Sequence, residues 1–185
     1  MWQFILGSTG FILYFIYDIN SVRMKNAVLQ KFFAAVVSLI AELYAAWGSC
    51  HRKIGTMTGF GLGGFLFFCL LIYTLFFALP FEETYCEENK LRAAYTEGMY
   101  GLCRHPGVLW FAGAYLCMWG MVGGWKQGIY FFLMIFWNYL YIIFQDLWTF
   151  PRTFFNYKEY QQSTPFLIPN RKSILVCLRT IRKND

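Results

Sequence analysis

Residues 57–80 form a single apolar block, with no Asp, Glu, Lys or Arg over the 24 residues from Met57 to Pro80. A helix of that length rises about 36 Å, which is enough to cross the ~30 Å hydrocarbon core of a bilayer. Soluble domains carry about a quarter charged residues, whereas this chain is 14% charged and 58% hydrophobic. The chain therefore cannot cover a water-facing surface, and we expect an integral, multi-pass membrane protein.

Four further blocks are apolar over about 17 to 18 residues, near the lower limit for a transmembrane helix. These blocks are Trp2–Ile19, Phe32–Gly48, Gly107–Gly124 and Gly128–Gln145. With the block at 57–80 they predict an all-α, polytopic membrane helix bundle of about five transmembrane helices. The alternative has four spans, with the first block lying at the membrane interface.

The basic residues predict the orientation of these spans. If the N-terminus lies outside, 13 of the 16 Lys and Arg residues fall in inner loops and the tail, and only Arg52, Lys53 and Lys126 fall outside. The positive-inside rule therefore predicts an N-out, C-in topology. Most of the net charge of +6 lies in the tail, where we expect contact with anionic lipid headgroups. No nucleic-acid signature is present.

This topology divides the chain into three regions. Residues 1–80 hold three spans, residues 81–170 hold two spans and the cytosolic motifs, and residues 171–185 form a basic tail. Within the second region, residues 154–160 form a short amphipathic stretch, predicted to be a cytosolic segment at the interface. The pattern Gly59-x-x-x-Gly63 in the third span predicts close helix packing.

The six cysteines form no CxxC pair and no metal-ligand spacing, and the chain has two histidines. A zinc site is therefore not expected. We expect the cysteines to serve as small apolar residues in spans or as free thiols in a reducing cytosol.

The first segment with chemical potential ends in Gly98-Met-Tyr-Gly-Leu-Cys-Arg-His-Pro106, directly before the fourth span. Its proline can occupy the first turn of a helix, which would leave the amides of Gly107 and Val108 as unpaired donors at the positive end of the helix dipole. Such amides bind a carboxylate or phosphate, and Arg104 and His105 add side-chain donors. Alternatively, Arg104 extends to lipid headgroups beside a helix-starting proline.

The second segment follows the fifth span. Asp146 is expected where this span leaves the bilayer, and an ionisable residue at that depth is a candidate for function or a solvated helix-end acid. Pro151 is expected to interrupt any continuing helix. The amphipathic stretch and a Pro165-Phe-Leu-Ile-Pro169 run come next, and they favour either an interfacial anchor or part of a site.

Taken in order, these motifs resemble a known family. Gly-x-Tyr-x-x-x-Arg-His-Pro, two spans, an acid, Phe-Phe, Tyr-x-x-Tyr and Pro-x-x-Ile-Pro occur over about residues 85–170. This order is similar to that of the isoprenylcysteine carboxyl methyltransferases and the related phospholipid N-methyltransferases. The resemblance implies S-adenosylmethionine-dependent methyl transfer to a lipophilic or membrane-embedded acceptor, with the active site on the cytosolic side.

The resemblance also implies the residues of the site. Arg104 and Asp146 become the candidate catalytic residues, with Asp146 at the family's acid position and suited to the cofactor's ammonium. The faces of Tyr95 or Tyr100 can stand near the sulfonium. The implied cofactor-binding residues are Arg92, Ala93, Ala94, Tyr95, Tyr100, His105, Pro106, Gly107, Val108 and Asp146, with Tyr85 as a further contact.

The chain departs from the family pattern at several positions. Val108 stands where a tyrosine is usual, and Ile142 stands where the isoprenylcysteine enzymes place an arginine. Asn156 replaces a glycine after the Phe-Phe pair, and asparagine also tolerates left-handed backbone geometry. The cofactor site is therefore better supported than any one acceptor. Two other readings stay open: an NADPH-dependent membrane reductase of the steroid-reductase type, and a non-catalytic lipid-binding membrane protein.

Overall fold

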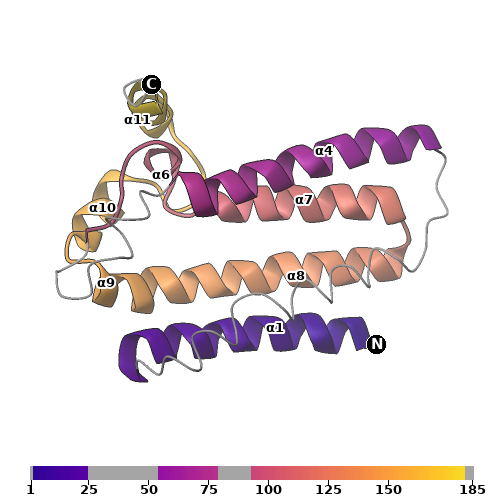
Figure 1. Ribbon diagram of the computed structural model, residues 1–185, viewed down its shortest axis with the longest axis horizontal. Coiled ribbons are helices and arrows are strands. Elements are labelled where there is room, and N and C mark those ends of the chain that lie inside the picture. The colour runs from indigo at the N-terminus through magenta and orange to yellow at the C-terminus, as the bar shows by residue number, and fades with distance from the viewer. Residues whose placement is uncertain (1, 25–53, 79–92, 182–185) are drawn as a thin grey trace. The chain divides into compact units, whose positions relative to one another are not determined.

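The computed structural model describes residues 2–24, 54–78 and 93–181, and the regular elements of these residues are all helical (Figure 1). The elements are α1 (Trp2–Ile19), the π-helical turn η1 (Asn20–Met24), α4 (Ile54–Ile72), the π-helical turn η2 (Tyr73–Phe77), α6 (Met99–Leu102), α7 (Pro106–Val122), α8 (Trp125–Phe144), the π-helical turn η3 (Gln145–Thr149), α9 (Phe150–Thr153), α10 (Tyr157–Ser163) and α11 (Arg171–Ile181). The all-α prediction is confirmed.

Three helical runs among the described residues are long and apolar enough to cross a membrane: Phe4–Arg23, Thr58–Leu75 and Trp125–Thr153. They cover the first, third and fifth predicted blocks. The fourth block corresponds to α7, an apolar helix of 17 residues. The second block, Phe32–Gly48, lies outside the described residues. The chain is thus a membrane protein by the length and apolar character of its helices.

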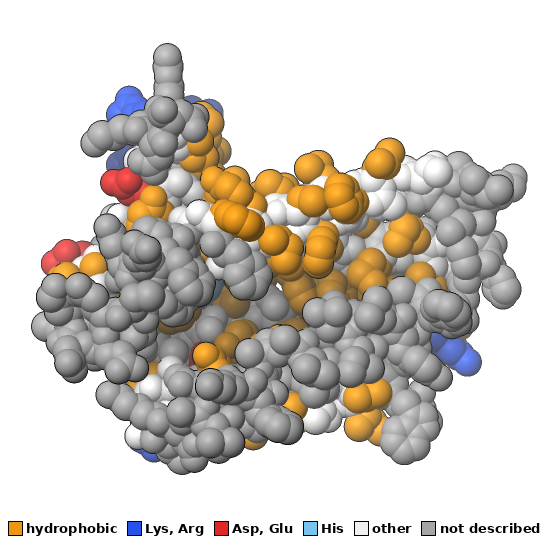
Figure 2. Space-filling view, in the orientation of Figure 1, with side chains coloured by type: hydrophobic (Ala, Val, Ile, Leu, Met, Phe, Trp, Pro, Cys, Tyr) orange, Lys and Arg blue, Asp and Glu red, His pale blue; other side chains and the backbone are white. Residues whose placement is uncertain are grey.

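The side chains of α4 agree with a lipid environment. Only 6% of the window Thr58–Leu75 is buried, and Leu62, Phe65 and Phe68 are among its exposed side chains. Hydrophobic side chains gather along this helix in Figure 2. An exposed apolar surface of this kind marks contact with lipid or with another protein, and the length of the helix favours lipid.

The prediction that Pro151 interrupts the helix is wrong. Helical residues run without a break from Trp125 to Thr153, and Pro151 lies in the first turn of α9, directly after η3. A proline is tolerated in a first turn, and the wider π-helical turn before it changes the hydrogen-bond ladder that the proline would otherwise break.

The described residues divide into two compact units, each formed from two stretches of the chain. Unit 1 comprises Met1–Leu66 with Ala112–Thr149, and unit 2 comprises Phe67–Phe111 with Phe150–Asp185. Both units contain residues from either side of the predicted region boundary at residue 80.

In unit 1, α1 and α8 lie side by side and run parallel (Figure 1). Near the start of both helices, the ring of Phe4 packs edge-on against Tyr130 at 5.6 Å between centroids. Near their ends, Phe15 packs on Phe144 at 5.1 Å. The contacting residue numbers rise together along both helices, which fixes the parallel direction.

The helices α4 and α7 pack antiparallel through small residues. A Cβ atom at Gly63 or Gly64 would lie 3.2–3.3 Å from side-chain atoms of Cys117, and a side chain at Gly120 would collide with the ring of Phe60. Glycine permits this close approach. No described atom lies within 4 Å of such a Cβ at Gly59, so the predicted Gly59-x-x-x-Gly63 contact holds only for its second glycine.

A tight turn joins α7 to α8. Gly123 and Gly124 have φ values of 74° and 83°, a left-handed conformation that favours glycine. The indole Nε1–H of Trp119 donates to the Gly124 carbonyl at 2.9 Å. The two helices therefore run antiparallel, and Tyr115 meets Phe131 across them.

We expect Gly64→Leu to lower the free energy of unfolding in detergent by about 1–3 kcal/mol, because the new side chain must displace Cys117 in a packed interface. Gly59→Leu is the matched control, since it adds the same side chain to the same helix in open space. Denaturant titration of both variants checks this prediction, and equal stabilities would contradict the packing role of Gly64.

Candidate functional site

In unit 2, the backbone before α7 is held by the chain after α9. The amide N–H of Ala94 donates to Oδ1 of Asn156 at 2.6 Å, and Nδ2 of Asn156 donates to the Ala94 carbonyl at 3.3 Å. One side chain thus satisfies both backbone groups of a residue that lies outside any helix. Asn156 itself has φ −93° and ψ 11°, so the expected left-handed geometry is not the reason for asparagine here.

Tyr100 is held in the same way. The Tyr160 hydroxyl donates to the Tyr100 carbonyl at 2.6 Å, and the Tyr100 hydroxyl donates to the Thr74 carbonyl at 3.1 Å. The ring of Tyr95 packs edge-on against Tyr100, with 6.4 Å between centroids. These side chains border an aromatic cluster whose buried members are Ala94, Tyr157 and Tyr160, with Tyr100, Phe150 and Phe154 packed against it.

Arg104 is directed into the protein. One terminal nitrogen of its guanidinium donates to the carbonyls of Gln161 and Thr164, at 2.8 and 2.9 Å. Its backbone N–H donates to the Pro165 carbonyl at 2.9 Å, and its guanidinium carbon lies 5.5 Å from the ring centre of Phe166. A basic side chain at helix-terminal carbonyls stabilises a helix end. Arg104 therefore positions the end of α10, and its predicted catalytic role stays a prediction.

His105 lies in an aromatic sandwich and is 6% exposed. Its imidazole stacks nearly parallel on Phe150, with 5.8 Å between centroids and 12° between planes. Phe166 meets the same ring edge-on at 5.1 Å. Two neighbouring rings thereby fix the plane of the imidazole, which restricts the directions in which its two nitrogens can form hydrogen bonds.

Pro106 is fully buried and starts α7, as its position in the first turn predicts. The amide of Val108 donates to the His105 carbonyl at 3.2 Å. The expectation that Val108 supplies an unpaired donor is therefore wrong, because its N–H bonds to the His105 carbonyl within the first turn. Gly107 lies against Leu71 and Leu75 of α4 and η2.

Cys103 lies between these groups and is fully buried. Burial raises the pKa of its thiol from 9.0 to about 11, with a smaller opposing effect from the hydrogen bond of the His105 backbone. Burial also raises the pKa of the Cys177 thiol. Both cysteines are free. No group of three or more His, Cys, Asp or Glu residues in the described part of the chain could hold a metal ion.

Asp146 belongs to unit 1, where it lies in η3 and is 4% exposed. The same turn, η3, contacts a second acid, Asp18 of α1, near the end of the first predicted block. Asp18 is buried and accepts a hydrogen bond from Oγ1 of Thr149 at 3.3 Å. Tyr141 and Gln145 also bond to Asp18, and Nε2 of Gln145 donates to the Tyr141 hydroxyl at 2.9 Å.

The structure therefore divides the predicted site residues between the two units. Asp146 is in unit 1, and Arg92 and Tyr85 lie outside the described residues. The remaining predicted residues are in unit 2: Ala93, Ala94, Tyr95, Tyr100, Arg104, His105, Pro106, Gly107 and Val108. Sequence reasoning missed Asn156 as a backbone clamp and Asp18 as a buried acid. A polar residue next to an apolar span was the signal for Asp18.

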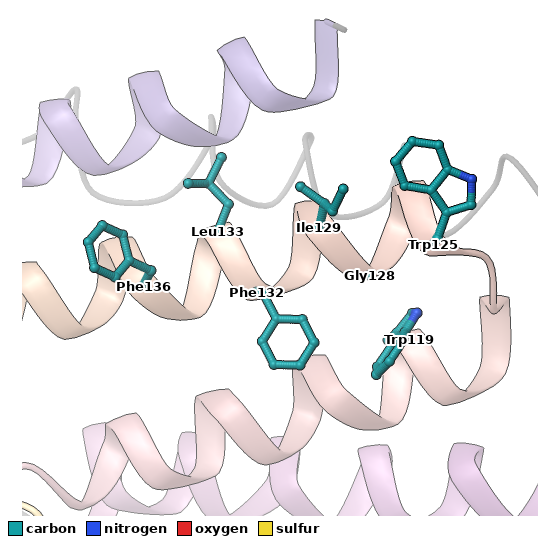
Figure 3. Close-up of a pocket in the computed structure, with 7 residues that line it drawn as sticks. All are labelled: Trp119, Trp125, Gly128, Ile129, Phe132, Leu133 and Phe136. Atoms are coloured by element: carbon teal, nitrogen blue, oxygen red, sulfur yellow. The ribbon is translucent and has the colours of Figure 1, made fainter.

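Unit 1 also contains an apolar hollow of about 530 Å³ along α7 and α8 (Figure 3). It is lined by Trp119, Trp125, Gly128, Ile129, Phe132, Leu133 and Phe136. No predicted site residue lines it, and its wall offers apolar contacts without a charged group. It therefore has the chemistry of a lipid-facing groove.

Comparison with protein-family models, curated proteins and solved structures found no match to this chain. The residues themselves therefore carry the functional argument.

Asn156→Ala should destabilise the protein by about 1–3 kcal/mol, because it leaves the Ala94 amide and carbonyl without this partner. Asn156→Asp is the matched control: it keeps the acceptor for the Ala94 N–H and replaces the donor with a carboxylate oxygen. Hydrogen exchange at Ala94 should accelerate strongly in the alanine variant and less in the aspartate variant. Equal exchange in all three proteins would contradict the clamp.

The raised pKa of the Cys103 thiol predicts that the free energy of unfolding depends on pH. The native thiol keeps its proton where the unfolded thiol loses it, so its stabilisation is full below about pH 9 and is lost as the pH rises through about pH 11. The loss should reach about 2–3 kcal/mol. Denaturation at several pH values should show a flatter profile for Cys103→Ala than for Cys69→Ala, which removes an exposed cysteine. Parallel profiles for the two variants would contradict the assignment.

Proposed function

We propose that this chain is an integral membrane methyltransferase that uses S-adenosylmethionine and methylates a lipophilic acceptor. One observation carries the proposal: the two sequence segments with the family-like motifs, about 60 residues apart, contact each other repeatedly within unit 2. Ala94 pairs with Asn156, Tyr100 with Tyr160, and Arg104 with Gln161, at separations of 57 to 62 residues. The antiparallel pair α7 and α8 brings the two segments to the same end, and the direct pairing of their motif residues supports the proposal.

The side chains in unit 2 fit the parts of the cofactor. Tyr95 and Tyr100 offer aromatic faces for a sulfonium. His105 is a titratable group held in a buried, aromatic setting, where a hydrogen bond to a carboxylate is stronger than in water. S-adenosylmethionine, when bound, supplies an activated methyl group, which an acceptor oxygen, nitrogen or sulfur takes as the methyl–sulfonium bond breaks and S-adenosylhomocysteine leaves. Water-poor surroundings favour that transfer because charge is dispersed in the transition state.

Arg104 and Asp146 have different roles in the proposed site. Arg104 acts as a positioning residue through the end of α10, and by that route orients His105 and Phe166. The family-like motif assigns Asp146 to the cofactor's ammonium. The assignment of Asp146 rests on the order of the motifs in the sequence.

The proposal includes five spans with the N-terminus outside. In unit 1, α1 runs parallel to α8, α8 antiparallel to α7, and α7 antiparallel to α4, so α1 and α4 point the same way. The fifth span of the proposal, Phe32–Gly48, lies outside the described residues. With the basic residues inside, residues 93–105 and the chain after α8 would face the cytosol.

Two other functions make different demands. A reductase of the steroid-reductase type would bind NADPH, whose phosphates need several basic contacts. A non-catalytic lipid-binding protein would bind neither nucleotide nor S-adenosyl compound. The aromatic and sparsely charged character of the residues around Tyr100 and His105 favours a sulfonium cofactor over a dinucleotide.

Calorimetry of the purified protein should detect S-adenosylhomocysteine binding and no NADPH binding. His105→Phe should weaken the affinity at least about fivefold, the equivalent of one lost hydrogen bond of ~1 kcal/mol. This variant keeps a ring between Phe150 and Phe166, so loss of packing is not its main effect. Lys158→Ala, on the exposed side of α10, is the control and should bind normally.

The possible results separate the three functions. NADPH binding without S-adenosylhomocysteine binding would replace the methyltransferase proposal with the reductase. Binding of neither would leave the lipid-binding protein. Unchanged affinity in His105→Phe would remove His105 from the cofactor site.

A further inference from the structure

The helix α11 has one face that packs on the protein. Its buried residues are Ser173 and Cys177. The amide of Gly98 donates to Oγ1 of Thr180 at 2.8 Å. A Cβ atom at Gly101 would lie 3.1 Å from Cγ1 of Val176, so α6 and α11 are in close contact. The last helix is therefore attached to the segment that carries Tyr100.

The start of α11 is also fixed. The Ser173 amide donates to Oδ1 of Asn170 at 2.9 Å, and the Asn170 amide donates to Oγ of Ser173 at 3.0 Å. This reciprocal pair is a capping box, which satisfies donors that a helix start otherwise leaves unpaired. The helix thus has a defined beginning and does not depend on its exposed faces for its shape.

A second face of α11 is apolar and exposed. Ile174, Leu178 and Ile181 follow one another at intervals of four and three residues, which places them on one side of a helix. Leu175 lies beside them. Leu178 is 62% exposed and Leu175 is 52% exposed. Burial of such side chains in an apolar medium is favourable by about 25 cal/mol per Å².

A third face is basic. Lys172 and Arg179, seven residues apart, are exposed along the side of the helix that adjoins Leu175, and Arg171 is exposed at its start. The helix contains no acidic residue. Basic and hydrophobic side chains appear together at the position of α11 in Figure 2. An apolar strip with adjoining cations matches a membrane surface in which acyl chains lie beneath anionic headgroups.

We infer that α11 docks in the plane of an anionic bilayer surface and thereby holds the segment with Tyr100 in place. The 11 residues of α11 rise about 16 Å, too short to cross a bilayer, so the helix lies at the surface. Ile174, Leu175 and Leu178 enter the acyl boundary, while Lys172 and Arg179 contact lipid phosphates. The contacts of Gly98 and Gly101 with α11 transmit the docking to α6.

Two properties of the chain favour a bilayer as the occupant of this surface. The described helices include three that are long and apolar enough to cross a membrane, and the net charge is +6. An amphipathic helix tethered to such spans meets lipid at a high effective concentration. A soluble acidic partner would match the cations and leave Leu175 and Leu178 in water.

Hydrogen–deuterium exchange of the full chain in nanodiscs tests this inference. Exchange of the α11 and α6 amides should be slower in phosphatidylcholine with phosphatidylserine than in phosphatidylcholine alone. Each basic residue near an anionic surface contributes about a fivefold factor, so Lys172 and Arg179 together give at most roughly a 25-fold slowing. The double variant Lys172→Glu/Arg179→Glu should abolish the difference between the two bilayers.

The matched control is Lys126→Glu/Lys158→Glu, which changes the net charge equally at exposed positions outside α11. It should keep the difference. Leu175→Gln/Leu178→Gln should exchange faster in both bilayers, because it removes the apolar insertion. Identical exchange of native α11 in the two bilayers would overturn the inference, as would protection that follows the protein-to-lipid ratio, the mark of a second copy. No cofactor is used, so failure of the methyltransferase proposal would leave this result unaffected.

Discussion

The structure of unit 2 depends on how the irregular backbone before α7 satisfies its polar groups. Residues 93–98 make no helical ladder, and buried amides and carbonyls without partners cost free energy. The chain after α9 supplies partners to Ala94 and Gly98 through Asn156 and Thr180, and to the Tyr100 carbonyl of α6 through Tyr160. The chain from Asn156 to Thr180 is therefore part of the framework of the candidate site, and a truncation that removes it would leave these backbone groups without these partners.

The same constraint separates two kinds of motif residue. Arg104 and Asn156 form hydrogen bonds with backbone carbonyls and amides of the chain itself. Their role is therefore to hold the backbone of unit 2 in place. His105 and Tyr95 make ring contacts, which hold the plane of each side chain. The motif thus contains residues that hold the backbone and residues whose rings are held in place.

The sequence predicted the elements that follow from apolar length, since a block without charges has few alternatives to a membrane helix. It also predicted that α7 starts at Pro106. It could not predict contacts that depend on three-dimensional pairing. The clamp of Asn156 on Ala94 spans 62 residues, and no local pattern encodes it. The helical run continues through Pro151 because the π-helical turn η3 precedes it. The wider hydrogen-bond spacing of this turn leaves no periodic pattern in the sequence.

Asp18 bears on whether the first block crosses the membrane or lies at its interface. Contacts between α1 and α8 extend from Phe4 with Tyr130 to Asp18 with Thr149, which is nearly the full length of both helices. An interfacial α1 would therefore require α8 to lie flat beside it, whereas the run that contains α8 is long and apolar enough to cross a membrane. The buried Asp18 at the end of α1 also bonds to Tyr141 at the end of α8 and to Gln145 and Thr149 of η3. The register between the two helices is thus set by polar contacts at one end and by aromatic packing along the rest, which favours α1 as a span of the bundle.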